Sequence, residues 1–199
     1  IQTRFGTKKL GYLWAILDPI STILVFSIIK ELLHSKAMQG ISYPVFLTSS
    51  LIAYYMFKNI ATKSMSAFEA NKGLFVYKQV KPFDTLVSRY ILEIFISGVV
   101  FTILLFIGWY IGLDVECKNI LGVILAYIWI SIFGFSLGIF FAVVGFFYEN
   151  FKKIISMLFL PLFFLSALFY TIDSLPPIVR EILLYNPLVH FMEMIHGNY

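Results

Sequence analysis

Five long apolar segments, separated by short polar stretches, constrain this chain more than any other feature of its sequence. They cover residues 11–29, 44–63, 85–113, 120–147 and 154–172. An α-helix needs about 20 mostly apolar residues to cross the hydrocarbon core of a bilayer. Backbone hydrogen bonds inside lipid must be made within the segment itself, which favours helices. We therefore predict five transmembrane helices.

The composition agrees with a membrane, rather than water, as the solvent. Of the 199 residues, 60% are hydrophobic and 13% are charged, whereas about a quarter of the residues of a soluble domain are charged. No internal repeat and no Gly/Ser-rich linker divides the chain. The predicted fold class is an all-α membrane protein, with residues 1–199 forming one transmembrane domain.

The Lys and Arg residues are distributed unequally between the two sides that these segments define. With the N-terminus inside, eleven of the 15 lie on the inner side. Cytoplasmic loops carry the excess of positive charge in membrane proteins, so we predict a cytoplasmic N-terminus. This orientation accounts for the net charge of +4 and gives no reason to expect a nucleic-acid partner.

Sequence motifs for catalysis are missing. There is no glycine-rich phosphate-binding loop, so this chain is not expected to hold ATP, and its single cysteine provides no pair for zinc. His190, Glu193 and His196 could share a helix face, and we interpret them as a polar surface rather than a metal site. The inner-side acids are scattered along the chain: Glu69, Asp84, Glu93 and Glu149. This scatter argues against a membrane-embedded transferase acting on lipid-linked sugars.

Charged residues inside apolar segments are costly and therefore informative. Asp18 is expected either to pair with a Lys or Arg at the inner interface or to face a neighbouring helix. Arg89 and Glu93 are four residues apart and are predicted to form an ion pair along one helix. The pairs Gly108–Gly112 and Gly134–Gly138 have the spacing that lets two helices approach closely.

Aromatic residues make up 19% of the chain. An aromatic ring can stack on the C–H face of a sugar and costs little entropy to hold in place, so some of these rings are candidates for lining a conduit. The alternative is packing, or anchoring at the membrane interface. The candidates are Tyr54, Tyr55, Phe57, Phe169 and Tyr170.

The segment 66–84 mixes charged and aromatic side chains on the inner side, and Lys81-Pro82 is predicted to end it. A short amphipathic element of this kind could dock in a cleft of a soluble partner through its aromatic side chains. A solvated loop resting on lipid headgroups fits the composition equally well. The residues of interest are Glu69, Asn71, Lys72, Gly73, Leu74, Phe75, Tyr77, Lys81, Pro82 and Phe83.

The last residues, 173–199, follow the fifth apolar segment and are predicted to lie on the outer side. Pro176-Pro177 can start a short helix that runs to about Tyr185. Asn186-Pro187 interrupts it, because the residue before a proline avoids the helical region, and residues 188–196 again have a helical, amphipathic pattern. We predict two short helices at the outer surface.

Several motifs along the chain carry a family resemblance. They are Arg4-Phe5-Gly6, LGYLWAILDP at 10–19, YPVFL at 43–47, EANKGLF at 69–75, VKPFDT at 80–85 and NPLVH at 186–190. In this order they resemble the permease subunits of bacterial polysaccharide ABC exporters, and most closely the group 2 capsule export permeases of the KpsM type.

This resemblance implies a six-span subunit, two copies of which form a conduit above two ATP-binding subunits. ATP and Mg²⁺ would belong to those partner subunits, and this chain would hold no cofactor. The element 69–83 would act as a cytoplasmic coupling helix, and the periplasmic short helices within 173–199 would cap the conduit. An interface segment ahead of the first span would include Arg4, Phe5, Tyr12 and Trp14.

The cargo implied by the resemblance is a lipid-linked capsular polysaccharide, which crosses the bacterial inner membrane and passes to outer-envelope export proteins. A related permease for O-antigen, teichoic acid or a drug is the alternative. The sequence departs from the family pattern because the sixth span and most of the leading helix are absent, so we expect truncation at both ends. It also ends in His196-Gly197-Asn198-Tyr199, where the family pattern suggests an Arg soon after the Glu.

Overall fold

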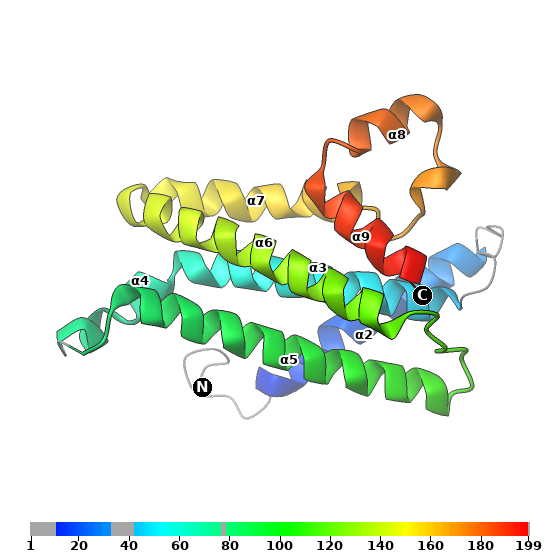
Figure 1. Ribbon diagram of the computed structural model, residues 1–199, viewed down its shortest axis with the longest axis horizontal. Helices are drawn as coiled ribbons and strands as arrows, with labels where there is room; N and C mark the ends of the chain where they lie inside the picture. The colour runs from blue at the N-terminus through cyan, green and yellow to red at the C-terminus, as the bar shows by residue number, and fades with distance from the viewer. Residues whose placement is uncertain (1–10, 33–41, 77–78, 199) are drawn as a thin grey trace.

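A computed structural model describes residues 11–32, 42–76 and 79–198, and within these ranges the chain is helical, without β-strands (Figure 1). The long helices are α2 (Gly11–Leu32), α3 (Tyr43–Met65), α5 (Pro82–Tyr110), α6 (Ile120–Phe147) and α7 (Glu149–Leu165). The short elements are α4 (Ala67–Ala70), η1 (Lys72–Val76), η2 (Ile172–Ser174), α8 (Pro177–Leu183) and α9 (Pro187–Asn198).

All five predicted apolar segments contain a helix, which confirms the all-α fold of the described residues. Among these residues, two helices are long and apolar enough to cross a membrane by length and composition, namely α5 and α6. The bounds of α6 match the prediction, and its first turn is capped by the Asn119 side chain, which accepts a hydrogen bond from the Gly122 amide. That α2, α3 and α7 also span the membrane stays a prediction.

Helix α7 ends earlier than predicted, at Leu165 rather than near residue 172. Ala167 has a φ of 55°, which lies outside the right-handed helical region. The Asn186 amide donates to the Leu165 carbonyl at 3.0 Å and so satisfies a carbonyl that the helix end leaves open. The apolar residues after the turn pack with Leu183 and Val189 of α8 and α9 instead of continuing the helix.

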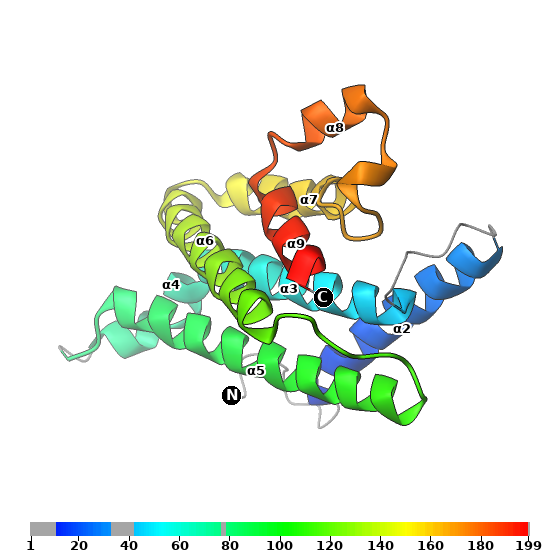
Figure 2. The ribbon, with the colours of Figure 1, turned by 45° about the vertical axis from the view of Figure 1, so that its right-hand side comes forward.

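Helix α3 is the centre of the molecule. Of its 23 residues, 16 are buried, and it packs against α2, α5, α6, α7 and α9 (Figures 1 and 2). By contrast, α5 and α6 expose large apolar side chains on their outer surfaces, including Phe95, Phe106 and Trp129. A buried central helix surrounded by helices with apolar outer faces suits a protein embedded in lipid.

The two glycine pairs have different roles. Gly134 and Gly138 of α6 face α3 at close range, since a Cβ atom on Gly134 would lie 3.1 Å from the Phe57 ring and one on Gly138 would lie 2.8 Å from Ser64 Oγ. This confirms the predicted close helix packing at this pair. Gly112, in contrast, lies beyond the end of α5 with a φ of +86°, so it serves a turn and not a helix interface.

Candidate functional site: the coupling element and its pocket

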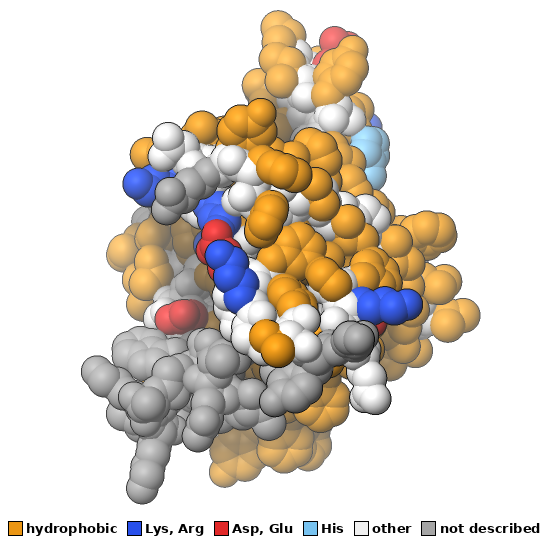
Figure 3. Space-filling model, turned by 90° about the vertical axis from the view of Figure 1, so that its left-hand side faces the viewer, with side chains coloured by type: hydrophobic (Ala, Val, Ile, Leu, Met, Phe, Trp, Pro, Cys, Tyr) orange, Lys and Arg blue, Asp and Glu red, His pale blue; other side chains and the backbone are white. Residues whose placement is uncertain are grey.

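The segment between α3 and α5 forms two short helical turns rather than an extended loop. Helix α3 ends at Met65, α4 follows directly, and the Asn71 amide donates to the Ala67 carbonyl at 2.7 Å, which caps α4. The 3₁₀ turn η1 continues the segment. We call Ser66–Phe83 the coupling element, and Figure 3 looks onto the end of the molecule where it lies, with Lys, Arg and acidic side chains set among apolar ones.

One side of the coupling element is buried against the helices. Ala67 is fully buried in a cluster with Leu86 of α5 and Ala142 of α6. The ring of Phe68 meets that of Phe146 edge-on, with 6.4 Å between their centroids. These contacts fix α4 against two long helices.

The other side of the coupling element is open, and this is the side where most of the predicted residues lie. Glu69, Lys72, Gly73, Lys81, Pro82 and Phe83 are exposed, whereas Asn71 and Phe75 are partly buried. The Leu74 side chain and the whole of Tyr77 are outside the described residues. Val76 is 83% exposed, and sequence reasoning missed it because an isolated valine gives no signal.

Lys81-Pro82 ends the short turns that follow α3, as predicted, because it starts helix α5. Asp84 Oδ2 accepts a hydrogen bond from the Lys81 amide at 2.8 Å, and this contact caps the first turn of α5. Proline suits the first helical position because its missing N–H would have no partner there. Pro82 and Phe83 therefore belong to α5, where Phe83 is 53% exposed.

An ion pair links the coupling element to the start of α7. Lys152 Nζ lies 2.6 Å from Glu69 Oε1, and this hydrogen bond and charge lower the pKa of the Glu69 carboxyl. The Lys152 side chain passes close to Gly145, where a Cβ atom would come within 3.5 Å of it. The coupling element is thus attached to α7 as well as to its own neighbours in sequence.

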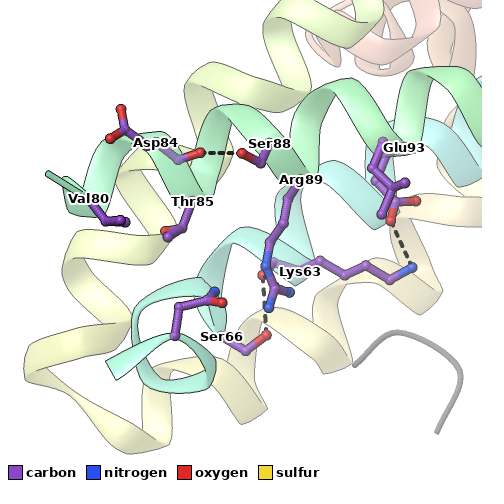
Figure 4. Close-up of a pocket in the computed structure, with 10 residues that line it drawn as sticks. Lys63, Ser66, Val80, Asp84, Thr85, Ser88, Arg89 and Glu93 are labelled. Atoms are coloured by element: carbon purple, nitrogen blue, oxygen red, sulfur yellow. Dashed lines mark hydrogen bonds and ion pairs between the residues drawn. The ribbon is translucent and has the colours of Figure 1, made fainter. Parts of the chain in front are cut away.

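An open pocket of about 410 Å³ lies between the coupling element and α5 (Figure 4). It brings together two cationic side chains, two carboxylates, three hydroxyls and an amide. Its lining consists of Lys63, Ser66, Asn71, Val80, Asp84, Thr85, Ser88, Arg89, Leu92 and Glu93.

The charges in this pocket pair across helices and not along one helix. Glu93, 1% exposed, forms an ion pair with Lys63 of α3, with Nζ and Oε1 3.1 Å apart. Arg89 instead donates a hydrogen bond to the Lys63 carbonyl at 3.3 Å. The predicted Arg89–Glu93 pair is therefore wrong, because the guanidinium turns towards the end of α3 (Figure 4). Lys63 was missed because its partner is 30 residues away.

Asp18 also differs from expectation. Its side chain is exposed, and it has no ion-pair partner within the part of the chain that the structure describes. Its carbonyl accepts hydrogen bonds from Ser21 and Thr22 one turn later in α2. The Asp18 carboxylate thus does not form the expected ion pair with a Lys or Arg of the described residues.

Two of the five aromatic candidates for a conduit lie in the core of the subunit. Tyr54 and Phe57 are each 1% exposed, and the Tyr54 hydroxyl donates to the Phe159 carbonyl at 2.5 Å. Their rings fill space between α3, α6 and α7, so in this structure they are packing residues, the alternative that the sequence left open.

The other three aromatic candidates are partly exposed. Tyr55 makes a hydrogen bond of 3.2 Å with Thr22 of α2. The ring of Phe169 contacts that of Phe26 in a tilted arrangement, with 4.1 Å between the ring centroids. The Tyr170 hydroxyl donates to a carbonyl of α7. Tyr55 and Phe169 pack against one cluster, where α2, α3 and the turn after α7 meet. Tyr170 packs against a second cluster, which includes Leu183 of α8 and Val189 of α9.

The predicted short helices at the other end of the molecule are present as α8 and α9. Here His196 Nε2 lies 2.6 Å from the Ser50 hydroxyl of α3, and its ring stacks on Phe46. Burial lowers the pKa of His196 to about 3. Glu193 accepts a hydrogen bond from the Ile172 amide, and His190 contacts the Leu184 carbonyl. The three residues have separate partners, and His196 faces α3 rather than the surface, so the predicted shared polar surface is not formed.

The predicted interface segment lies mostly outside the described residues. This holds for Arg4 and Phe5 entirely and for the side chains of Tyr12 and Trp14, whose backbone forms the first turn of α2.

The profile of the ABC-2 type transporter family matches residues 1–199. The chain belongs to this family. Among curated proteins, it is similar to the polysialic acid transport protein KpsM of Escherichia coli, with 39% identity over 98% of this chain and 75% of the relative. The capsule polysaccharide export inner-membrane protein CtrC of Neisseria meningitidis is 27% identical over the whole chain and 75% of the relative. The O-antigen export system permease protein RfbA of Klebsiella pneumoniae is 26% identical over 94% of this chain and 72% of the relative.

Proposed function

We propose that this ABC-2 type chain is the membrane-spanning subunit of an ATP-driven exporter that moves lipid-linked capsular polysaccharide from the cytoplasm to the periplasm. The observation that carries the proposal is the 39% identity to a polysialic acid transport protein over 98% of the chain. The all-helical fold with two strongly apolar helices supports a place in the inner membrane. The charge distribution supports a cytoplasmic N-terminus.

The proposed exporter is a homodimer that works with two ATP-binding subunits, which hold ATP and Mg²⁺ and perform the hydrolysis. The coupling element supports this division of labour, because one of its sides is fixed to α5 and α6 while the other presents exposed charged and aromatic side chains. A movement of the ATP-binding subunits would reach the spans as a rigid-body shift. Of the conduit candidates, Tyr55, Phe169 and Tyr170 remain in the proposal. Outer-envelope proteins would then receive the polymer.

Deletion of the gene, followed by fractionation and surface labelling of the capsular polymer, tests the cargo. Full-length polymer held in the cytoplasm supports an exporter of this polymer, whereas absence of any polymer would indicate a role in synthesis. A normal capsule would instead assign the transporter to another cargo. O-antigen is the second candidate, because an O-antigen permease is among the relatives.

Substitutions on the coupling element test the docking of the ATP-binding subunits. Phe75→Ala and Phe83→Ala are expected to leave the protein inserted in the membrane and to reduce polymer export per ATP hydrolysed, because large side chains at an interface provide most of its binding energy. Phe106→Ala, a change to an exposed ring far along α5, is the matched control. Unchanged export in both test variants would contradict the docking role.

A further inference from the structure

Lys152 carries a positive charge at a position of α7 where the helix dipole disfavours one. Helix α7 begins at Glu149, so Lys152 lies among its first four residues, whose free N–H groups already carry partial positive charge. An acidic side chain beside the lysine offsets this cost. Glu69 of α4 provides one, with its Oε1 2.6 Å from Lys152 Nζ. The pair therefore joins the coupling element to the start of α7, and both lie at the same end of the molecule (Figure 1).

Packing on α6 holds the Lys152 side chain in place. Its stem passes over Gly145, where a Cβ atom would lie 3.5 Å from both Cγ and Cε of the lysine. The Lys152 side chain is 22% exposed, compared with 49% for that of Glu69. A lysine with a packed stem keeps only its ammonium group free to adjust to the acid. A displacement of Glu69 is therefore passed on to α7 and is not absorbed by a loose side chain.

Helix α7 is held less tightly than α3. Of the α7 side chains that the structure describes, only that of Phe159 is buried, whereas 16 of the 23 residues of α3 are buried. An open apolar groove of about 340 Å³ lies between α7 and its neighbours α3 and α6, and its lining includes Phe57, Leu137, Leu158 and Leu162. Side chains along the groove lack neighbours on one side, so a movement of α7 breaks fewer contacts than a movement of α3.

The later part of α7 is fixed at two of its carbonyl groups. The Tyr54 hydroxyl donates to the carbonyl of Phe159, and the Asn186 amide donates to that of Leu165. Pro161 lies between them and lacks the N–H that would close a helical hydrogen bond, and helices kink at such positions. The first turns of α7, which come before both contacts, can therefore bend against the fixed part.

We propose that the Glu69–Lys152 pair passes a movement of the coupling element to the first turns of α7 and so changes the width of the apolar groove. This rests on the proposed function, because the movement comes from ATP-binding subunits docked on the coupling element. Glu69 and Lys152 are positioning residues, since they act through α7 and not on the polymer. Helix α3 ends at Met65 and leads directly into the coupling element, so the pair gives that element a second helix to move.

Exchange of the two charges tests this link in the full transporter complex. Glu69→Lys and Lys152→Glu each place like charges where the pair was, and each should lower polymer export per ATP hydrolysed about two- to five-fold, the range expected for a partly exposed pair. The charge exchange, Glu69→Lys with Lys152→Glu, restores the attraction and should recover most of that loss. An acidic side chain also suits the start of a helix, so the defect of Lys152→Glu would not come from unfolding of α7.

The adjacent cation Lys153 provides the matched control, because it is an exposed residue of α7. Glu69→Lys combined with Lys153→Glu should export no better than Glu69→Lys alone. The charge exchange separates the link from a docking role of Glu69, because a docking contact of Glu69 would stay lost when Lys152 is changed as well. A charge exchange as impaired as Glu69→Lys would therefore overturn the proposal, and so would wild-type export by both single variants.

Cross-linking across the groove tests the movement of α7 without any polymer. Leu137→Cys in α6 and Leu158→Cys in α7 both lie in the groove lining, and Cys117→Ser removes the native thiol. The purified complex, whose ATP hydrolysis shows that the ATP-binding subunits are docked, is treated with a bifunctional thiol reagent, either without nucleotide or after trapping with ATP and vanadate.

The cross-linking yield should differ between the two nucleotide states in this parent, become equal when Lys152→Glu is added, and differ again in the charge exchange. Equal yields in the parent, or a difference that persists with Lys152→Glu, would overturn the proposal. A wrong assignment of the cargo would leave these yields unchanged, so the link and the proposed function fail separately.

Discussion

Among the charged contacts of the described residues, the ion pair between Lys63 and Glu93 should be the most sensitive to substitution. Glu93 is 1% exposed, and its Oε1 lies 3.1 Å from Lys63 Nζ. Replacing Lys63 by Met keeps much of the side-chain volume but removes the charge that accompanies the buried carboxylate. Breaking one partner of a buried pair costs about 3–5 kcal/mol. For a chain of this size, we expect the midpoint of thermal unfolding to fall by roughly 6–20 °C.

The double variant Lys63→Met with Glu93→Met separates the effect of the charge from that of packing. Exchanging both members of a buried ion pair for apolar side chains of similar volume is often neutral or stabilising, so the double variant should unfold close to the wild-type temperature. The measurement is thermal unfolding in detergent, followed by size-exclusion chromatography. Lys152→Met serves as control, because it breaks the more exposed pair with Glu69 and should change the midpoint little. If the single and double variants lose the same stability, the reasoning from the broken ion pair is refuted.

Three further predictions concern packing and protonation. Gly138→Leu should strongly reduce the yield of folded protein, because a Cβ atom there would come within 2.8 Å of a side chain of α3. Gly98→Leu should be tolerated, because there is open space around Gly98. Equal yields of the two variants would contradict the close approach of α6 to α3. Tyr54→Phe should cost about 1 kcal/mol in unfolding experiments through loss of the hydrogen bond to Phe159, and an unchanged midpoint would exclude that contribution. In the folded chain the pKa of His196 is lowered to about 3, so on acidification the unfolded chain takes up a proton at this residue before the folded chain does. The free energy of unfolding therefore falls as the pH drops from about 6.5 towards 3, and at pH 5 the loss should be about 2 kcal/mol. His196→Gln should remove this part of the pH dependence.

The positions of the long helices could be predicted from the sequence because each depends on a local run of apolar residues. Helix α6 shows this best, since an uninterrupted apolar run and a capping asparagine define its bounds. The end of α7 could not be predicted in this way. It is set by Ala167 in a left-handed conformation and by the amide of Asn186, which lies 21 residues further along the chain.

The candidate site shows the same limit more clearly. Arg89 and Glu93 have the spacing of a helical ion pair, yet each has its contact on α3. Local spacing shows which pairs can form, whereas the pair that does form depends on how close a third charged group lies in the folded chain. Tyr54 follows the same rule, because nothing in its own segment reveals that a carbonyl of α7 will accept a hydrogen bond from its hydroxyl.

Helix α3 connects the two ends of the molecule in a way that bears on the proposed transport. At one end, its Lys63 contacts Glu93 and Arg89 beside the coupling element. At the other end, its Ser50 contacts His196 of α9. The 16 buried residues of α3 leave little room for it to bend, because close-packed interiors resist continuous deformation. If partner subunits move the coupling element, we therefore expect α3 to move as one body and to carry the displacement to α9. The Ser50→Ala variant should then export less polymer per ATP hydrolysed than the wild type. An unchanged ratio of export to ATP hydrolysis would show that the displacement reaches α9 by another route.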